Sequence, residues 1–253
     1  LHALDWPAEN LATAARAVCP TLLGKLFARE GGPRLSRAEQ LRMLSTAVTV
    51  LMGKSSDDPY LKALRQAEVS GSTLATLVRE QGLYRGRHLT LLAFSLGAFL
   101  TTHFLLQVQT PAVLVQDVVL LGASVAVDFF EEALPRLIGP GGVVRGRLTV
   151  LHSSNDAVLR YMFRARHLRC TALGFKGLSP RRVAARLRAA DEALRALSPA
   201  EVDEYVSVKY ACVDVSATID GHGSYWAQLG NILDELDLSG HLGLFPEAEL
   251  MYE

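Results

Sequence analysis

Three short apolar segments, each followed by a helix-like segment, limit the fold of this chain more than any other feature. The segments HLTLLAF (88–94), DVVLLGAS (117–124) and GRLTVLHSS (146–154) are apolar at consecutive positions rather than at alternating ones. A strand with this pattern is buried on both faces, which is typical of a parallel sheet that helices cover on both sides. The chain is therefore predicted to be an α/β protein with a mostly parallel sheet.

Helical patterns fill the intervals between these strands. Helices are expected at 59–81, at 96–107, around Phe129 and Phe130, at 156–168, at 179–197 and at 227–236, and a last strand is expected at 205–215. Before them, LHALD (1–5) predicts a strand, and residues 11–53 predict a helical hairpin inserted after it. With 253 residues the chain is predicted to form a single domain over 1–253.

Ser95 stands where the first of the three strands meets a helix, in the sequence AFSLG. A nucleophile elbow requires a strand, a very tight turn and a helix, with small residues two positions before and after the nucleophile. Ala93 and Gly97 occupy those positions, and the backbone N–H of Leu96 would face a developing oxyanion. On these five residues alone, a serine that caps an ordinary strand-to-helix turn explains the pattern equally well.

The order of polar residues along the chain favours the elbow. In the α/β-hydrolase fold the acid and the histidine follow the serine, each in a loop after a strand. Asp156 follows the strand predicted at 146–154, and His222 follows the last predicted strand in the loop IDGHGSY. His222 would then be the general base and Asp156 its orienting acid, with Asp128 as the alternative acid. The remaining histidines are predicted to be structural or exposed: His2, His88, His103, His152, His167 and His241.

Composition excludes several classes of function. The formal net charge is zero, which does not favour nucleic-acid binding. The three cysteines, Cys19, Cys170 and Cys212, show no metal-ligand spacing, so neither a metal site nor another cofactor is predicted. An odd number of cysteines without a disulfide pattern fits an intracellular, reducing compartment.

Charge is distributed unevenly along the chain. Between Arg145 and Arg188 there are eleven basic residues and one acid, whereas from Asp191 onward there are thirteen acids and two bases. A basic face could attract anionic lipid headgroups or an acidic partner. The favoured interpretation is that the Arg-rich helix and the acidic tail are solvated or pair with each other.

Several segments together resemble the domain-of-unknown-function 726 family of transmembrane and coiled-coil domain-containing, α/β-hydrolase-like proteins. The segments that carry the resemblance are DDPYLKALRQAEVSGSTLATLV, LLAFSLGA, DVVLLGAS, GRLTVLHSSNDAVLRYMFR and VDVSATIDGHGSYW, in that order. The family's elbow serine corresponds here to Ser95 and its aspartate to Asp156. The histidine and tyrosine of its G-H-x-x-Y motif correspond to His222 and Tyr225. The resemblance covers roughly 1–174 and 205–236, and it implies that the Arg-rich segment 175–204 is an insertion.

The resemblance also implies departures from an intact hydrolase. Ala93 replaces the first glycine of the family's elbow. The strand at 1–5 corresponds to the one before the hairpin, so earlier N-terminal strands are expected to be missing, together with the loop that supplies a second oxyanion donor. A protein partner or an N-terminal segment is expected to cover the sheet edge left exposed. In relatives the segment that corresponds to LDW and the helices after it is long enough to associate with membranes.

Two functions follow from these observations. The first is a serine hydrolase acting on an ester, plausibly a lipid ester, through Ser95, Asp156 and His222. The alternative is a catalytically weakened hydrolase-fold scaffold, a structural subunit of a larger membrane-associated or organellar complex. An adaptor that lies on a membrane surface through the 11–53 hairpin is a weaker third option. The expected location is intracellular and membrane-associated or organellar, with mitochondria among the options.

Overall fold

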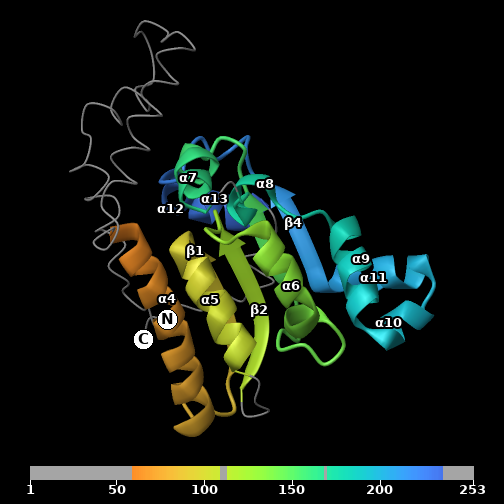
Figure 1. Cartoon of the computed structure of the whole chain (residues 1–253). Coiled ribbons are helices and arrows are strands. Elements are labelled where there is room, and N and C mark those ends of the chain that lie inside the picture. The colour runs from red at the N-terminus through yellow and green to blue at the C-terminus, as the bar shows by residue number, and fades with distance from the viewer. Residues whose placement is uncertain (1–58, 109–112, 168–169, 236–253) are drawn as a thin grey trace, which may run out of the picture. The chain divides into compact units, whose positions relative to one another are not determined.

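The computed structural model describes residues 59–108, 113–167 and 170–235 (Figure 1). The chain divides into two compact units, Leu1–Gln66 and Ala67–Glu253, and of the first only the start of one helix is described. The strand predicted at 1–5 and the hairpin predicted at 11–53 lie outside the described residues. The same holds for the expectation that earlier N-terminal strands are missing.

Four parallel strands form the sheet of the second unit. They are β1 (His88–Phe94), β2 (Leu114–Leu121), β3 (Leu148–His152) and β4 (Tyr210–Asp214), and each pairs with the next in chain order. The register aligns Phe94 with Leu121, Leu121 with Leu151 and His152 with Asp214. The carboxyl ends of all four strands therefore lie at one edge. The predicted α/β fold with a parallel sheet is confirmed.

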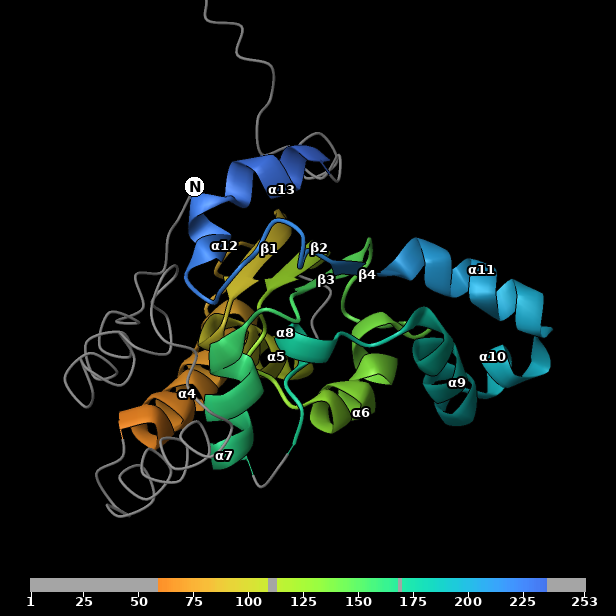
Figure 2. The ribbon, with the colours of Figure 1, turned by 90° about the horizontal axis from the view of Figure 1, so that it is seen from above.

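Helices connect the strands and cover both faces of the sheet. In chain order they are α4 (Pro59–Glu80), α5 (Leu96–Gln107), α6 (Val127–Ile138), the π-helix η1 (Val158–Phe163), α7 (Arg164–Arg166), α8 (Leu173–Lys176), α9 (Pro180–Ala190), α10 (Glu192–Ala196), α11 (Pro199–Lys209), α12 (Ser224–Ala227) and α13 (Leu229–Glu235). Figure 2 shows α5 and α6 on one side of the sheet and α12 and α13 on the other.

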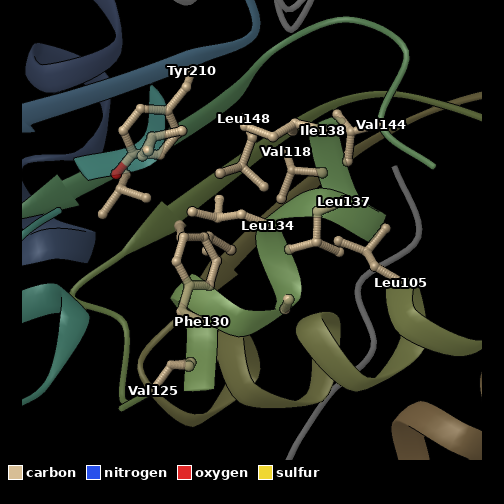
Figure 3. Close-up of a cluster of buried hydrophobic side chains, with 14 of the residues drawn as sticks. Leu105, Val118, Val125, Phe130, Leu134, Leu137, Ile138, Val144, Leu148 and Tyr210 are labelled. Carbon is tan, nitrogen blue, oxygen red and sulfur yellow. The ribbon is translucent and has the colours of Figure 1, made fainter. Parts of the chain in front are cut away.

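Successive side chains of β2 face opposite layers of the core. Val118 belongs to the larger cluster of buried residues, together with Phe130 of α6 (Figure 3). Val119, the next residue, belongs to a second cluster with Ile232 of α13. All four side chains are buried. This alternation explains why the strand is apolar at four consecutive positions from Val118 to Leu121, since each face packs against a different layer.

The strand predicted at 205–215 was wrong in its first half. Residues Pro199–Lys209 form α11, and only Tyr210–Asp214 form β4. Ser198 and Glu201 make a capping box that begins the helix. Val202 and Val206 are both buried, whereas Val208 is 64 % exposed, which is the four-residue spacing of a helix face. The β-branched residues of this segment suggested a strand, and the capping box overrode that preference.

The single helix predicted at 179–197 was also wrong, because it is broken in the middle. Asp191 has extended backbone angles, φ −124° and ψ 126°, between α9 and α10. Its carboxylate accepts a hydrogen bond from the Leu194 N–H at 3.1 Å and so begins α10 as an N-cap. Two other predicted elements differ in extent: β3 ends at His152, and the helix expected at 227–236 begins at Leu229 as α13, with the short α12 before it.

The Arg-rich helix α9 packs against α6 rather than presenting a free basic face along its whole length. The Arg182 guanidinium forms an ion pair with the Glu131 carboxylate of α6. Arg186 Nε donates a hydrogen bond to the Glu131 carbonyl oxygen at 3.2 Å. Part of the basic charge between Arg145 and Arg188 is therefore paired within the fold.

Gly174 of α8 makes a close backbone contact that predicts a large effect on stability. A Cβ at this position would lie 2.1 Å from the Ala123 nitrogen and 2.2 Å from the Gly122 carbonyl carbon. Backbone cannot move aside as a side-chain end can, so Gly174→Ala should destabilise the protein by about 3 kcal/mol. The matched control is Gly97→Ala, where a Cβ meets no described atom within 4 Å. Urea unfolding of both variants checks this prediction, and equal stabilities would contradict it.

Candidate active site

Ser95 occupies a strained turn between β1 and α5. Its backbone has φ 52° and ψ −120°, a region that non-glycine residues rarely adopt and that stores about 1–3 kcal/mol of strain. The turn is held by the Ser95 N–H, which donates to the Leu121 oxygen at 3.0 Å, and by the Ser95 carbonyl, which accepts from the Ser124 N–H at 3.0 Å. The Ser95 hydroxyl makes no capping bond to α5. An ordinary helix-capping serine would make that bond, so the capping interpretation does not describe this residue.

The structure brings Ser95, His222 and Asp156 together in one hydrogen-bonded chain. His222 Nε2 lies 2.7 Å from Ser95 Oγ, and His222 Nδ1 lies 2.6 Å from Asp156 Oδ2. An ionised carboxylate only accepts hydrogen bonds, so the imidazole proton belongs on Nδ1 and Nε2 accepts the proton of the serine hydroxyl. This tautomer is the one that can take a proton from Ser95.

The Asp156 carboxylate is fully buried, and both of its oxygens are occupied. Oδ2 accepts from His222, and Oδ1 accepts from the Leu159 N–H at 2.9 Å. Leu159 lies in the π-helix η1, a type of helix that is rare and is frequently found at functional sites. The unusual first turn after Asp156 therefore fixes the direction of the carboxylate toward His222.

A polar network joins the loop that carries Asp156 to the loop that carries His222. The Ser153 hydroxyl, which is buried, donates to the Ile219 oxygen at 2.8 Å. The Asn155 side-chain amide donates to the Ser216 oxygen at 2.8 Å. Sequence analysis did not single out Ser153, Asn155 or Ser216, although the polar run SSND after an apolar strand was the available signal. These hydrogen bonds hold the two loops next to each other, and His222 and Asp156 are in contact across the same pair of loops.

The alternative residues considered from the sequence lie elsewhere. Asp128 is an exposed residue in the first turn of α6, and the His222 ring bonds to Asp156 instead. Asp214 accepts from the Ser216 N–H at 2.9 Å in a local turn. Burial lowers the pKa of His103 and of His152, so both are neutral near pH 7. The Ser95 hydroxyl is hydrogen-bonded to His222 instead.

The Leu96 N–H lies at the N-terminus of α5, where an oxyanion formed at Ser95 would be held. Leu96 is the first helical residue after Ser95, and its N–H donates to no other described residue. The N-terminus of a helix carries a partial positive charge, and α5 is 12 residues long.

Ala93 fits beside the turn as a buried residue. The expectation that Gly97 must be small was wrong for the described residues, because the space around it is open.

Tyr225, three residues after His222, packs against the end of β2. Its ring packs on Gly122, where an added Cβ would lie 2.7 Å from the Tyr225 Cε2 atom, and Gly122 itself has φ +48°. The Tyr225 side chain is fully buried, and its hydroxyl has no hydrogen-bond partner in the described part of the chain. Burial, with the nearby charges of Asp156 and Asp214, raises the pKa of Tyr225, so the phenol stays neutral.

Removal of the Tyr225 hydroxyl should therefore stabilise the protein. A buried hydroxyl without a partner costs about 1–3 kcal/mol, so Tyr225→Phe should raise the free energy of unfolding by about 1 kcal/mol. The ring would still pack on Gly122, and His222 would keep its position. Tyr225→Ala is the opposite case, since loss of the ring should destabilise by about 3–5 kcal/mol. Thermal and urea unfolding distinguish the two, and a destabilised Tyr225→Phe would show that the hydroxyl has a partner.

No candidate metal site accompanies these residues. Within the ranges that the structure describes, His, Cys, Asp and Glu side chains form no group of three that could hold a metal ion. The groups that the structure brings together at the site are the serine hydroxyl, the imidazole and the buried carboxylate. Together the fold and the site define a parallel α/β protein with a hydrogen-bonded Ser-His-Asp set at the carboxyl edge of its sheet.

The chain belongs to DUF726, a family described as proteins of unknown function, which matches residues 1–185. Ser95 and Asp156 lie within this range, and His222 lies beyond it. The chain is also 26% identical over 251 residues to the rice (Oryza sativa subsp. japonica) "Transmembrane and coiled-coil domain-containing protein STS1", across 96% of this chain and 33% of that protein. It thus spans about a third of the relative's length. No solved structure matches the chain significantly.

Proposed function

We propose that this chain is a serine hydrolase that cleaves esters. The observation that carries the proposal is the pair of contacts at His222, 2.7 Å to Ser95 Oγ and 2.6 Å to Asp156 Oδ2. Nucleophile, base and orienting acid are within hydrogen-bond reach of one another in the order that acyl transfer needs. The strain at Ser95 adds support, because the surrounding structure maintains a backbone conformation that a structural serine does not require.

The reaction would proceed in two acyl-transfer steps. Ser95 Oγ attacks the ester carbonyl carbon while His222 Nε2 takes the hydroxyl proton, and the buried Asp156 carboxylate stabilises the imidazolium. The Leu96 N–H donates to the oxyanion of the tetrahedral intermediate. The C–O bond to the alcohol then breaks, and the alcohol leaves with the proton from His222. Water, deprotonated by His222, attacks the acyl-serine ester and releases the carboxylic acid and free Ser95.

Esters are the proposed class because they demand least of the oxyanion site. The described residues supply one backbone donor, Leu96, and removing one donor from such a site typically lowers kcat about 10²–10³-fold. An alkoxide leaves more readily than an amine, so ester cleavage tolerates this loss better than amide cleavage.

A lipid ester is the finer proposal. It rests on the rice relative, which is named as a transmembrane protein, and we extend a membrane-associated location to this chain on the same ground. Among the described helices, none is both long and apolar enough to cross a bilayer.

Covalent labelling tests the proposed nucleophile. A fluorophosphonate reacts with an activated serine and leaves a phosphonyl group that mass spectrometry can place on a peptide. We expect labelling at Ser95 alone, abolished in His222→Ala and retained in Ser207→Ala, a variant of an exposed serine on α11. Absence of labelling in wild-type protein with the expected circular dichroism would refute the proposal.

The second candidate function is a scaffold within a larger complex, and β1 favours it. Within the described ranges, β1 pairs only with β2, so its other edge has no hydrogen-bonded neighbour there. An unpaired strand edge is a template for another strand. We propose that a protein partner covers this N-terminal edge of the sheet. A stoichiometric complex that co-purifies equally with wild type and Ser95→Ala would support the scaffold, whereas an isolated, active monomer would argue against it.

A further inference from the structure

Three aromatic side chains form a continuous cluster beside Ser95, which we call the aromatic shelf: Phe94, Tyr225 and Trp226. Phe94 immediately precedes Ser95, and its ring lies 4.9 Å from the His222 ring between ring centroids. The same Phe94 ring lies 5.6 Å from Tyr225 and 5.7 Å from Trp226. In both Figure 1 and Figure 2 helix α12, which carries Tyr225 and Trp226, lies beside the carboxyl end of β1. The shelf thus runs from the buried core, past the imidazole, to the surface.

The outer end of the shelf is open to solvent. Trp226 is 54 % exposed, whereas Tyr225 at the inner end is fully buried. At Gly97, two residues after Ser95, an added Cβ would meet no described atom within 4 Å. Burial of a large apolar ring is favourable, so an apolar ligand that covered the exposed Trp226 ring would gain free energy of binding.

The segments around the shelf carry almost no charge. Residues 221–233 contain no Asp, Glu, Lys or Arg, and residues 89–102 contain none either, in a chain that is 21% charged. His222 is the only basic side chain of the first segment, and its two ring nitrogens are hydrogen-bonded to Ser95 and Asp156. A charged group of a substrate would find no counter-charge on these segments. An apolar group would lose no hydrogen bond by lying there and would cover the Trp226 ring.

We propose that Phe94 and Trp226 bind an apolar alkyl group of the ester, and that Trp226 is a specificity-determining residue for the length of that group. The inference rests on the proposed ester hydrolase function and adds the class of substrate: esters with a long alkyl chain on the acyl or the alcohol side. Each methylene buried on the shelf contributes about 0.8 kcal/mol, which corresponds to about fourfold in kcat/KM. The serine, histidine and aspartate supply the chemistry, and the shelf decides which ester reaches them.

Two ester series test this proposal and separate the two sides of the ester. One series varies the acyl chain from acetate to octanoate with p-nitrophenol as the alcohol, and the other varies the alcohol chain of acetate esters. In wild type, kcat/KM should rise about fourfold per methylene in one series. Trp226→Ser should lower kcat/KM for the longest ester about tenfold or more and change that for p-nitrophenyl acetate less than twofold. Trp226→Phe should keep most of the slope, and Ala227→Ser, an exposed neighbour on α12, should keep all of it.

Several outcomes would overturn the proposal. An unchanged slope in Trp226→Ser, or an equal loss for short and long esters, would show that Trp226 does not select chain length. A loss confined to esters carried in phosphatidylcholine vesicles would make Trp226 a membrane contact instead of a substrate contact.

A binding measurement distinguishes failure of this inference from failure of the proposed function. In Ser95→Ala with Trp6→Phe, Trp226 is the only tryptophan, and an octanoyl ester remains uncleaved. Its fluorescence should shift to the blue with the octanoyl ester and stay unchanged with the acetyl ester. A shift without hydrolysis by wild type would refute the hydrolase and support the contact, whereas hydrolysis without a shift would refute the contact alone.

Discussion

Replacement of Ser95 by alanine should abolish ester hydrolysis, with kcat lowered by about 10⁴–10⁶-fold. The alanine has no oxygen to attack the carbonyl carbon, and the Ser95 hydroxyl is the group that is hydrogen-bonded to His222 Nε2. Stability should change little, because the Ser95 side chain makes no capping bond to α5 and alanine accepts the same strained turn at similar cost. Initial rates with p-nitrophenyl butyrate, beside urea unfolding of the same preparation, measure both quantities.

The double variant Ser95→Ala, His222→Ala makes this prediction sharper. Residues that act as one catalytic unit are non-additive, so the double variant should be no slower than either single variant. Ser207→Ala is the control for replacement of a serine, and its kcat should equal that of wild type. A Ser95→Ala protein that keeps a tenth of the wild-type rate would mean that hydrolysis arises from another residue or from a contaminant.

Replacement of Asp156 by asparagine should lower kcat by about 10⁴-fold while the protein remains folded. The asparagine oxygen can still accept from the Leu159 N–H, which directs the side-chain NH₂ toward His222 Nδ1. His222 Nδ1 must then accept a hydrogen bond from this NH₂ group, so the imidazole proton moves to Nε2. A protonated Nε2 cannot take the proton of Ser95, and the base is lost although its position is kept.

Asp128→Asn is the matched control for this substitution. Asp128 is an exposed residue of α6, and it was the alternative acid on sequence grounds. The Asp128 substitution should change kcat less than twofold. The fluorophosphonate labelling rate gives the same comparison without turnover, because it also depends on removal of the Ser95 proton. Equal losses in the two variants would contradict the assignment of Asp156 as the orienting acid.

The elbow is a case in which local sequence was close to sufficient. Ser95 follows a strand that ends in the apolar run Leu91–Phe94, and the helix after it begins at Leu96, as the pattern predicted. The strain at φ 52° was implied by so tight a turn, because strand and helix are separated by a single residue. In contrast, the boundary between α11 and β4 was misjudged, because Val206 and Val208 suit a strand and a helix face alike until the neighbouring layer is known.

Apolar runs and chain order predict the parallel α/β sheet and the succession Ser95, Asp156, His222, because both can be recognised without knowing the strand register. Which polar groups come into contact depends on the tertiary packing. His222 is 127 positions from Ser95 and 66 from Asp156, so their contacts depend on how β3 and β4 align and on how Ser153 and Asn155 join two loops. The exposed Trp226 beside Phe94 was likewise decided by packing, since no local pattern states which aromatic residue remains uncovered.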